Sequence, residues 1–219
     1  LLIRDAGIYT VDNNFSRAEA MVISEGRIVA TGSVKEMEDS YEAREVRSLA
    51  GACVYPGWID AHCHFFGYGM DLNEADVSGT RSVQEILDIL KKHKENSPGP
   101  WITGRGWDQN DWEVKEFPDR TLLDAQFPDT PVLLRRIDGH AAWVNSKALE
   151  MAGVSAGTPV EGGAVLLKDG EPSGILVDNA IGLVSRIIPE ASDKEIINAL
   201  MQAQENCFSV GLTSVNDAG

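Results

Sequence analysis

Short apolar runs separated by polar turns fill the first part of the chain. Two of these runs, at 20–23 and 27–30, are separated by Glu25 and Gly26. A glycine-containing pair between two apolar runs is a hairpin signal, because glycine reaches the positive φ values that a tight turn needs. The pattern therefore predicts a small β-rich segment over residues 1–55.

Longer apolar runs alternate with helical patterns over the rest of the chain, residues 56–219. The runs with the length of a buried strand lie at 52–62, 101–104, 131–136 and 211–215. Apolar residues recur at helical spacing at 81–96, 145–151 and 192–210, where the predicted N-caps are Ser82, Asn145 and Ser192. A shorter helix begins at Ser33. A hairpin insertion is predicted near 163–176, because Asp169 and Gly170 interrupt two strand-like runs.

Alternating strands and helices form parallel βα units. A complete eight-stranded βα barrel takes about 250 residues, so this chain can hold only part of one. The predicted fold is α/β: the N-terminal part of a (β/α)8 TIM-type barrel, with about half of its strands, preceded by the small β-rich segment.

Charge and composition exclude several classes of function. Asp and Glu number 34 against 19 Lys and Arg, which gives a net charge of −15. Such a surface repels phosphate groups and anionic lipid, so we expect no binding to nucleic acid or to a membrane. No apolar run approaches the roughly 20 residues that cross a bilayer. The three cysteines do not form a disulfide pattern, which favours a cytoplasmic location.

The strongest chemical signal is the run DAHCH at 60–64, where the first barrel-type strand ends. Alternate residues of a strand share a face, so His62 and His64 lie on one side and Cys63 on the other. Two imidazoles on a rigid strand can bind one divalent metal ion, and barrels carry their active sites at this end of their strands. The alternative is a pair of surface histidines bonded to water or backbone.

Longer motifs link this signal to a known family. The run PGWIDAHCH at 56–64 resembles the signature of the amidohydrolase superfamily, and GRIVATG at 26–32 looks like part of its N-terminal β-sandwich. Three further runs resemble the family-3, YtcJ-like branch: GRGWD at 104–108, RIDGHAAWVNSKAL at 136–149 and GLTSVNDAG at 211–219.

The resemblance implies a distorted barrel that holds one or two divalent metal ions, usually zinc, with His62 and His64 as the first ligands. It implies hydrolysis of amide-type C–N bonds other than peptide bonds by a metal-activated water. The family takes two further histidines and an aspartate from later strands, and no position up to Gly219 matches them. We therefore expect an N-terminal fragment that is inactive alone and needs the missing half of the barrel or self-association.

The family stretches also suggest further site residues. His140 is a candidate catalytic residue, as a substrate or oxyanion contact or a further ligand; the alternative is a loop histidine packed on Trp143. Asp178 stands where the family usually has glutamate, and could serve as a ligand, as a proton shuttle or as a helix-start carboxylate. Trp107 and Asp108 look like part of the wall around a small amide-type substrate.

A different class of function stays open. The chain could be a non-catalytic metal- or small-molecule-binding domain derived from the amidohydrolase fold. Asp217, after the last predicted strand, could likewise bind metal or only cap a turn.

Overall fold

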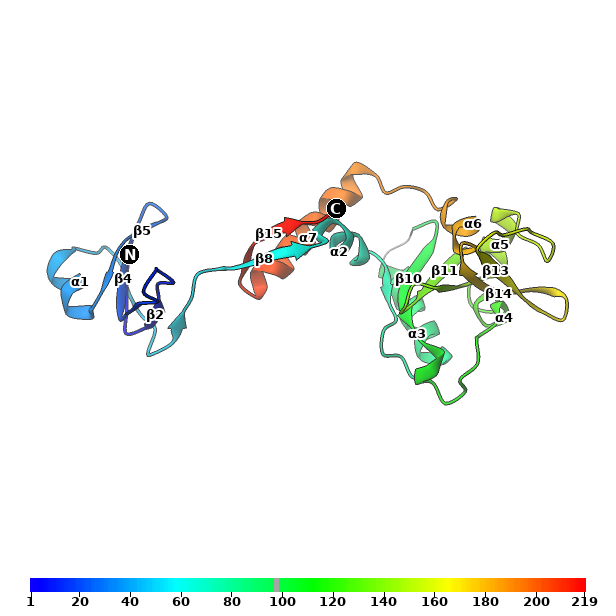
Figure 1. Ribbon diagram of the computed structural model, residues 1–219, viewed down its shortest axis with the longest axis horizontal. Helices are drawn as coiled ribbons and strands as arrows, with labels where there is room; N and C mark the ends of the chain where they lie inside the picture. Colours follow the sequence, from blue (N-terminus) through cyan, green and yellow to red (C-terminus); the bar gives the residue numbers. More distant parts are fainter. Residues whose placement is uncertain (97–98) are drawn as a thin grey trace. The chain divides into compact units, whose positions relative to one another are not determined.

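Figure 1 shows the computed structural model of the chain, which describes residues 1–96 and 99–219. Contacts between Cα atoms divide the chain into two compact units. The first contains Leu1–His62 and Cys207–Asn216, and the second contains Cys63–Asn206 and Asp217–Gly219. The boundary predicted after residue 55, between the small β-rich segment and the barrel, refers to the complete protein and stays a prediction.

Two small sheets make up most of the first unit. Their strands are β1 (Leu2–Arg4), β2 (Gly7–Tyr9), β3 (Arg17–Ala18), β4 (Ala20–Ser24), β5 (Arg27–Gly32), β6 (Val46–Ser48) and β7 (Cys53–Val54). The orders are β5-β4-β1-β6 and β3-β2-β7. Met21 of β4 packs with Ile8 of β2 and Ala18 of β3, so the sheets share a core. Helix α1 (Val34–Ser40) buries Met37 against Leu2.

The turn between β4 and β5 confirms the predicted hairpin. Glu25 has a φ of 50° and Gly26 a φ of 74°. Positive φ at both central residues is typical of the type I′ turn, whose twist matches that of the flanking strands. Ser24 and Arg27 pair across the turn.

The strand predicted at 52–62 is two strands. β7 pairs with β2, whereas β8 (Trp58–Cys63) pairs with β15 (Leu212–Asp217). Pro56 lies between β7 and β8, and proline has no N–H to continue a ladder of hydrogen bonds. Next to it, a Cβ atom added at Gly57 would lie only 2.2 Å from the Thr213 hydroxyl, so glycine is required for this close approach.

β8 and β15 run in the same direction. At the start of the pair the Trp58 N–H donates to the Gly211 carbonyl (2.8 Å), and at the end the Ala218 N–H donates to the Cys63 carbonyl (2.8 Å). The connection between the strands includes α2 (Phe65–Asp71), a separate sheet and α7 (Asp193–Ser209). β8, α7 and β15 therefore form a parallel strand–helix–strand unit with a sheet inserted in its crossover (Figure 1).

The inserted sheet has six strands. They are β9 (Ala75–Asp76), β10 (Ile102–Trp107), β11 (Val132–Arg136), β12 (Ala141–Val144), β13 (Gly163–Lys168) and β14 (Glu171–Asp178). The order is β13-β14-β12-β11-β10-β9. β9, β10 and β11 are parallel, while β12, β13 and β14 are antiparallel to their neighbours. β13 and β14 form the hairpin predicted near 163–176.

This topology corrects the predicted sheet. The runs at 101–104 and 131–136 form β10 and β11, which pair in the six-stranded sheet and not with β8. The prediction of four successive barrel-type strands is therefore wrong, although an α/β fold is confirmed. β12 was missed, because the turn at Asp138 and Gly139 makes it the antiparallel partner of β11 instead of the start of a helical crossover. β15 was predicted to be buried, but most of its residues are exposed.

Helices cover both faces of the six-stranded sheet. α3 (Val83–Asn96) packs Ile86 and Leu90 against Ile102 and Val132 on one face. The other helices of this unit are η1 (Gln109–Asp111), α4 (Arg120–Asp124), α5 (Ser146–Ala152) and α6 (Ile181–Ser185). α5 and α6 join a second hydrophobic cluster.

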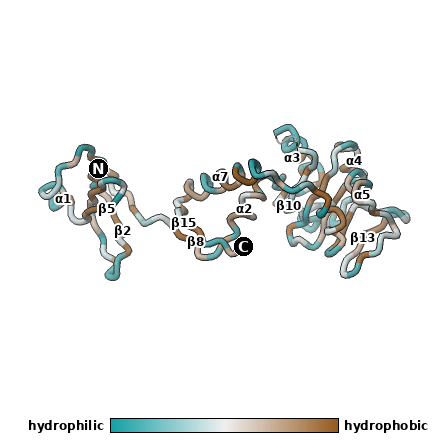
Figure 2. Tube along the Cα trace, turned by 90° about the horizontal axis from the view of Figure 1, so that it is seen from above, coloured by the Kyte–Doolittle hydropathy of each residue, from teal (hydrophilic) through white to brown (hydrophobic). Residues whose placement is uncertain are grey.

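Hydrophobic and hydrophilic positions alternate along α7 (Figure 2). Across residues 1–96 and 99–219, no helix combines the length and apolar character required to cross a membrane.

Asn145 links α5 to the sheet. It is 0% exposed, and its Oδ1 accepts hydrogen bonds from the N–H groups of Val132 (3.0 Å) and Ala148 (3.0 Å). Its Nδ2 donates to the carbonyl groups of Phe127 (2.9 Å) and Thr130 (2.9 Å). The interpretation of Asn145 as a helix cap is confirmed, and the same side chain also forms hydrogen bonds with backbone groups of Val132, Phe127 and Thr130.

Replacing Asn145 by alanine should lower the free energy of unfolding by about 2–4 kcal/mol, because the cap is lost and buried backbone groups lose their partners. Urea unfolding of both proteins measures this difference. Asn110→Ala, at an exposed position, is the control and should change stability by less than about 0.5 kcal/mol. Equal unfolding midpoints for the two variants would contradict the prediction.

Candidate functional site

The predicted metal-binding histidines lie at the end of β8. His62 is within the strand, and His64 is the residue from which α2 begins. Both residues are exposed, and the prediction that they share one side rests on the alternation of an extended strand. The His64 Nδ1 lies 3.0 Å from the Gly219 carbonyl. Since a carbonyl only accepts, Nδ1 is the donor in this contact.

Asp217, at the end of β15, caps the turn beside His64. Its two carboxylate oxygens accept hydrogen bonds from the N–H groups of Gly219 (3.0 Å) and Phe66 (3.2 Å). These backbone donors lower the pKa of Asp217 below its ordinary value, and the nearby His64 lowers it further. Asp217 therefore ties the loop after β15 to the start of α2.

The histidine pair fits a divalent metal in its chemistry but is an incomplete set. Neutral imidazoles are good ligands for zinc, and a catalytic zinc ion usually has three protein ligands. Over the described ranges 1–96 and 99–219, no three His, Cys, Asp or Glu side chains gather as a metal site. Metal binding by His62 and His64 therefore stays a prediction.

The structure brings His140 and Asp178 together, although the sequence predicted them separately. β12 and β14 pair with Ala141 opposite Val177, which places His140 and Asp178 at the adjoining strand ends. The His140 Nδ1–H donates to the Asp178 carboxylate (2.8 Å), and the Asp178 N–H donates to the His140 carbonyl (2.9 Å). Asp178 has a φ of 49°, a left-handed conformation that aspartate tolerates better than most residues.

The His140–Asp178 pair is open to solvent, and its hydrogen bond and charges favour one protonation state of His140. The side chains of His140 and Asp178 are 76% and 47% exposed. The hydrogen bond to Asp178 raises the pKa of His140 above its ordinary value, and the charges of Asp178 and Asp138 add to the effect. The pair therefore favours the imidazolium form of His140.

The structure contradicts one of the two alternatives for these residues. Asp178 makes no capping hydrogen bond, because α6 begins after Ala180 with no side-chain bond at its cap. Its role as a carboxylate near the start of a helix stays a prediction. His140 is not packed on Trp143, because the Trp143 side chain is fully buried while His140 is exposed.

Trp107 and Asp108, the predicted substrate wall, have structural partners. Trp107 is 0% exposed, and its indole N–H donates to the Leu134 carbonyl (2.8 Å). Asp108 accepts a hydrogen bond from the guanidinium of Arg136 (2.6 Å). Burial alone would raise the pKa of Asp108, but the Asn110 N–H and Arg136 hold it below its ordinary value. Trp107 is a core residue here, and substrate contact by either residue stays a prediction.

No role was predicted for Arg136, which the structure places between the candidate residue Asp108 and the turn residue Asp138. Its guanidinium contacts Asp108, Asp138 and Gln109. A single arginine after an apolar run carries no distinctive sequence signal, so only the fold reveals this arrangement.

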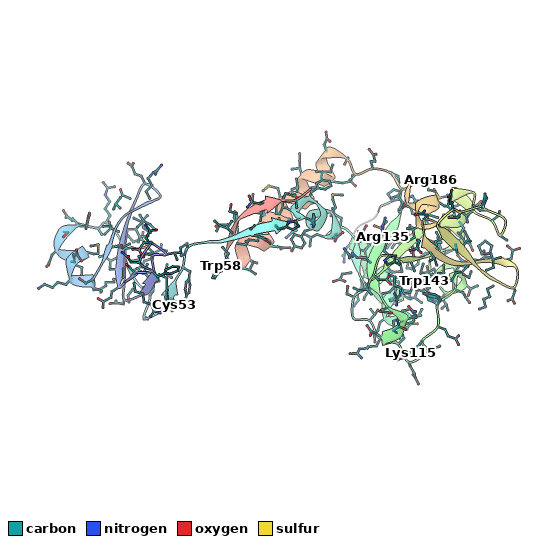
Figure 3. The ribbon with its side chains drawn as sticks, viewed as in Figure 1. Cys53, Trp58, Lys115, Arg135, Trp143 and Arg186 are labelled. Carbon is teal, nitrogen blue, oxygen red and sulfur yellow. The ribbon has the colours of Figure 1, made fainter. Side chains whose placement is uncertain are left out.

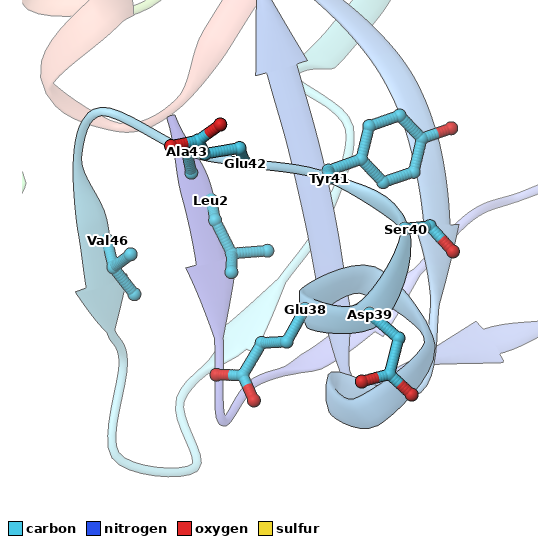
Figure 4. Close-up of a pocket in the computed structure, with 8 residues that line it drawn as sticks. All are labelled: Leu2, Glu38, Asp39, Ser40, Tyr41, Glu42, Ala43 and Val46. Carbon is cyan, nitrogen blue, oxygen red and sulfur yellow. The ribbon is translucent and has the colours of Figure 1, made fainter.

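A pocket of about 430 Å³ lies beside α1 in the first unit (Figure 4). Its lining residues are Leu2, Glu38, Asp39, Ser40, Tyr41, Glu42, Ala43 and Val46. None of the candidate catalytic or metal-binding residues is among them. The pocket therefore adds nothing to the histidine pair of β8 or to the His140–Asp178 pair.

Known proteins are similar to this chain in sequence and in fold. YtcJ of Bacillus subtilis (strain 168), which is named as an amidohydrolase, is 38% identical over 211 residues, covering 94% of this chain and 40% of YtcJ. The N-substituted formamide deformylase of Arthrobacter pascens is 30% identical, covering 100% of this chain and 42% of that protein. The chain thus spans about two fifths of the length of these relatives.

A solved structure and a family comparison agree with these relatives. An uncharacterized metal-dependent hydrolase from Pyrococcus horikoshii OT3 superposes with a TM-score of 0.69 at 29% identity, covering 98% of this chain and 42% of that one. Residues 45–219 match the amidohydrolase family, which bears out the resemblance of the motifs at 56–64, 104–108, 136–149 and 211–219. The chain belongs to the amidohydrolase family.

Proposed function

We propose that this chain is the N-terminal part of a metal-dependent hydrolase that cleaves amide-type C–N bonds other than peptide bonds. The observation that carries the proposal is the pair of imidazoles at the end of β8, a strand held in parallel pairing with β15. The name of the Arthrobacter pascens relative, an N-substituted formamide deformylase, supports a small amide-type substrate.

His62 and His64 would hold the metal, with His64 using its Nε2 because Nδ1 donates to the Gly219 carbonyl. Zinc suits this donor set best, as one ion or two. When bound, such an ion lowers the pKa of a water ligand toward about 7 and so supplies a nucleophile. Asp217 holds the loop after β15 against α2 and so keeps the Gly219 carbonyl, which His64 contacts, in place.

The fold of the whole protein would complete the ligand set. β8, α7 and β15 have the connectivity of two neighbouring strands of a βα barrel. The six-stranded sheet would then be an insertion between the first two barrel strands, and not a continuation of the barrel. The rest of the barrel, or a second copy of the chain, would supply further ligands and cover exposed apolar residues such as Ile59.

His140 and Asp178 would handle protons during the reaction. The Asp178 carboxylate binds the Nδ1–H of His140, and Nε2 takes no part in this hydrogen bond. A histidine whose second nitrogen is held by a carboxylate is well suited to accept a proton and donate it later. Asp178, one carbon shorter than the family's usual glutamate, would orient His140 in this scheme.

A non-catalytic binding domain is the second candidate. The incomplete ligand set among residues 1–96 and 99–219 favours it. Metal binding by the whole protein without turnover of any amide would support this candidate over the hydrolase.

Zinc binding tests the ligand assignment. Replacing His62 and His64 together by alanine should reduce zinc affinity of the purified chain at least about tenfold, because both imidazole donors are lost. Isothermal titration calorimetry and metal analysis measure the change. His93→Ala, on α3, is the control and should bind like the unmodified chain. Equal zinc affinity in the double variant would refute the assignment.

Turnover by the whole protein tests the activity. With zinc, it should hydrolyse members of a panel of N-formyl, N-acyl and cyclic amides, whereas residues 1–219 alone should show no turnover. His140→Gln in the whole protein should lower kcat/KM roughly 100-fold, as expected for loss of a proton-transfer group. Unchanged kcat/KM would remove His140 from the mechanism.

The charge on Asp178 should control the titration of His140. Asp178→Asn should lower the pKa of His140 toward its ordinary value of 6.5, as followed by NMR of the imidazole. Folding raises this pKa, so the His140–Asp178 pair stabilises the folded protein at pH values below the pKa of His140 in the unfolded chain. This stabilisation is lost as the pH rises through the higher pKa of His140 in the folded protein. His93, whose pKa is lowered by burial, is the internal control and should not change.

A further inference from the structure

We propose that Arg136 is a positioning residue that fixes His140 for proton transfer by holding the turn between β11 and β12. This inference rests on the proton-transfer role given to His140 under the proposed function. It concerns a residue outside the histidine pair and outside the His140–Asp178 pair.

Arg136 is mostly buried, and each nitrogen of its guanidinium donates a hydrogen bond. Its side chain is 13% exposed, at the end of β11. Nη2 donates to the Asp108 carboxylate (2.6 Å), Nε donates to the Gln109 side-chain oxygen (2.9 Å), and Nη1 donates to the Asp138 carboxylate. Burying a guanidinium is costly unless partners surround it. Three acceptors around one side chain therefore fix its position.

Asp138 carries this constraint to His140. One Asp138 oxygen binds Arg136, and the other accepts a hydrogen bond from the His140 N–H (3.0 Å). The turn is also closed in its backbone, because the Gly139 N–H donates to the Arg136 carbonyl (2.9 Å) and Gly139 takes a φ of 76°. A continuous series of bonds thus runs from Arg136 through Asp138 to His140, and on to Asp178.

The neighbouring arginine shows that position, and not charge alone, gives Arg136 this role. Arg135, labelled in Figure 3, is exposed and forms no ion pair in the part of the chain that the structure describes. Arg135 and Arg136 carry the same charge one residue apart on β11. Arg135→Gln is therefore a matched control for Arg136→Gln.

Two variants separate the geometry of Arg136 from its charge. Arg136→Gln removes both, whereas Arg136→Lys keeps the charge but lacks the planar fork that reaches several acceptors. In both variants we expect the turn to loosen, the His140–Asp178 hydrogen bond to weaken and the pKa of His140 to fall toward 6.5. The His140 amide should exchange with solvent at least about tenfold faster, because its acceptor is released.

NMR of the 219-residue chain provides both readouts without metal or substrate. If Arg136 acted only by neutralising Asp138, Arg136→Gln would raise the pKa of His140 and Arg136→Lys would leave it unchanged. Either result, or an effect of Arg135→Gln equal to that of Arg136→Gln, overturns the proposal. If Arg136→Gln does not fold, Arg136→Lys alone decides.

The outcome is independent of the proposed activity. A fall in the pKa of His140 in a protein that hydrolyses no amide would keep Arg136 as the organiser of the turn and reject the catalytic role of His140. Turnover of the whole protein together with an unchanged pKa in Arg136→Lys would reject the positioning role alone.

Discussion

The parallel pairing of β8 with β15 is the constraint on which the candidate metal site depends. These strands are separated by about 150 residues of sequence, yet backbone hydrogen bonds join them at both ends, from Trp58 to Gly211 and from Ala218 to Cys63. Parallel strands place their carboxyl ends at the same edge. The loop that carries His64 and the loop that carries Asp217 are therefore neighbours, and a shift in this pairing would separate them.

The second group of candidate residues depends on a different sheet. His140 and Asp178 meet because β12 and β14 are antiparallel neighbours in the inserted six-stranded sheet. This sheet has a dense hydrophobic core of its own, which includes Trp107 and Trp143.

Local elements of the fold followed from the sequence, because their causes lie within a few residues. The hairpin at Glu25 and Gly26 needs only two positive φ values, and the caps at Ser33, Ser82 and Asn145 need one side chain near a free N–H. The association of strands did not follow. β10 and β11 have the apolar composition of barrel strands, but composition does not specify a partner strand, and they pair in the inserted sheet instead of with β8.

The sequence by itself determined the family, the spacing of His62 and His64 and the chemistry that such a pair supports. Only the tertiary structure decided that Asp178 is the partner of His140, that Trp107 is buried and that Arg136 joins Asp108 to Asp138. The physical reason is the range of the interactions. Strand alternation and helix capping act between near neighbours in sequence, whereas these contacts depend on strand order and register, which the whole chain sets together.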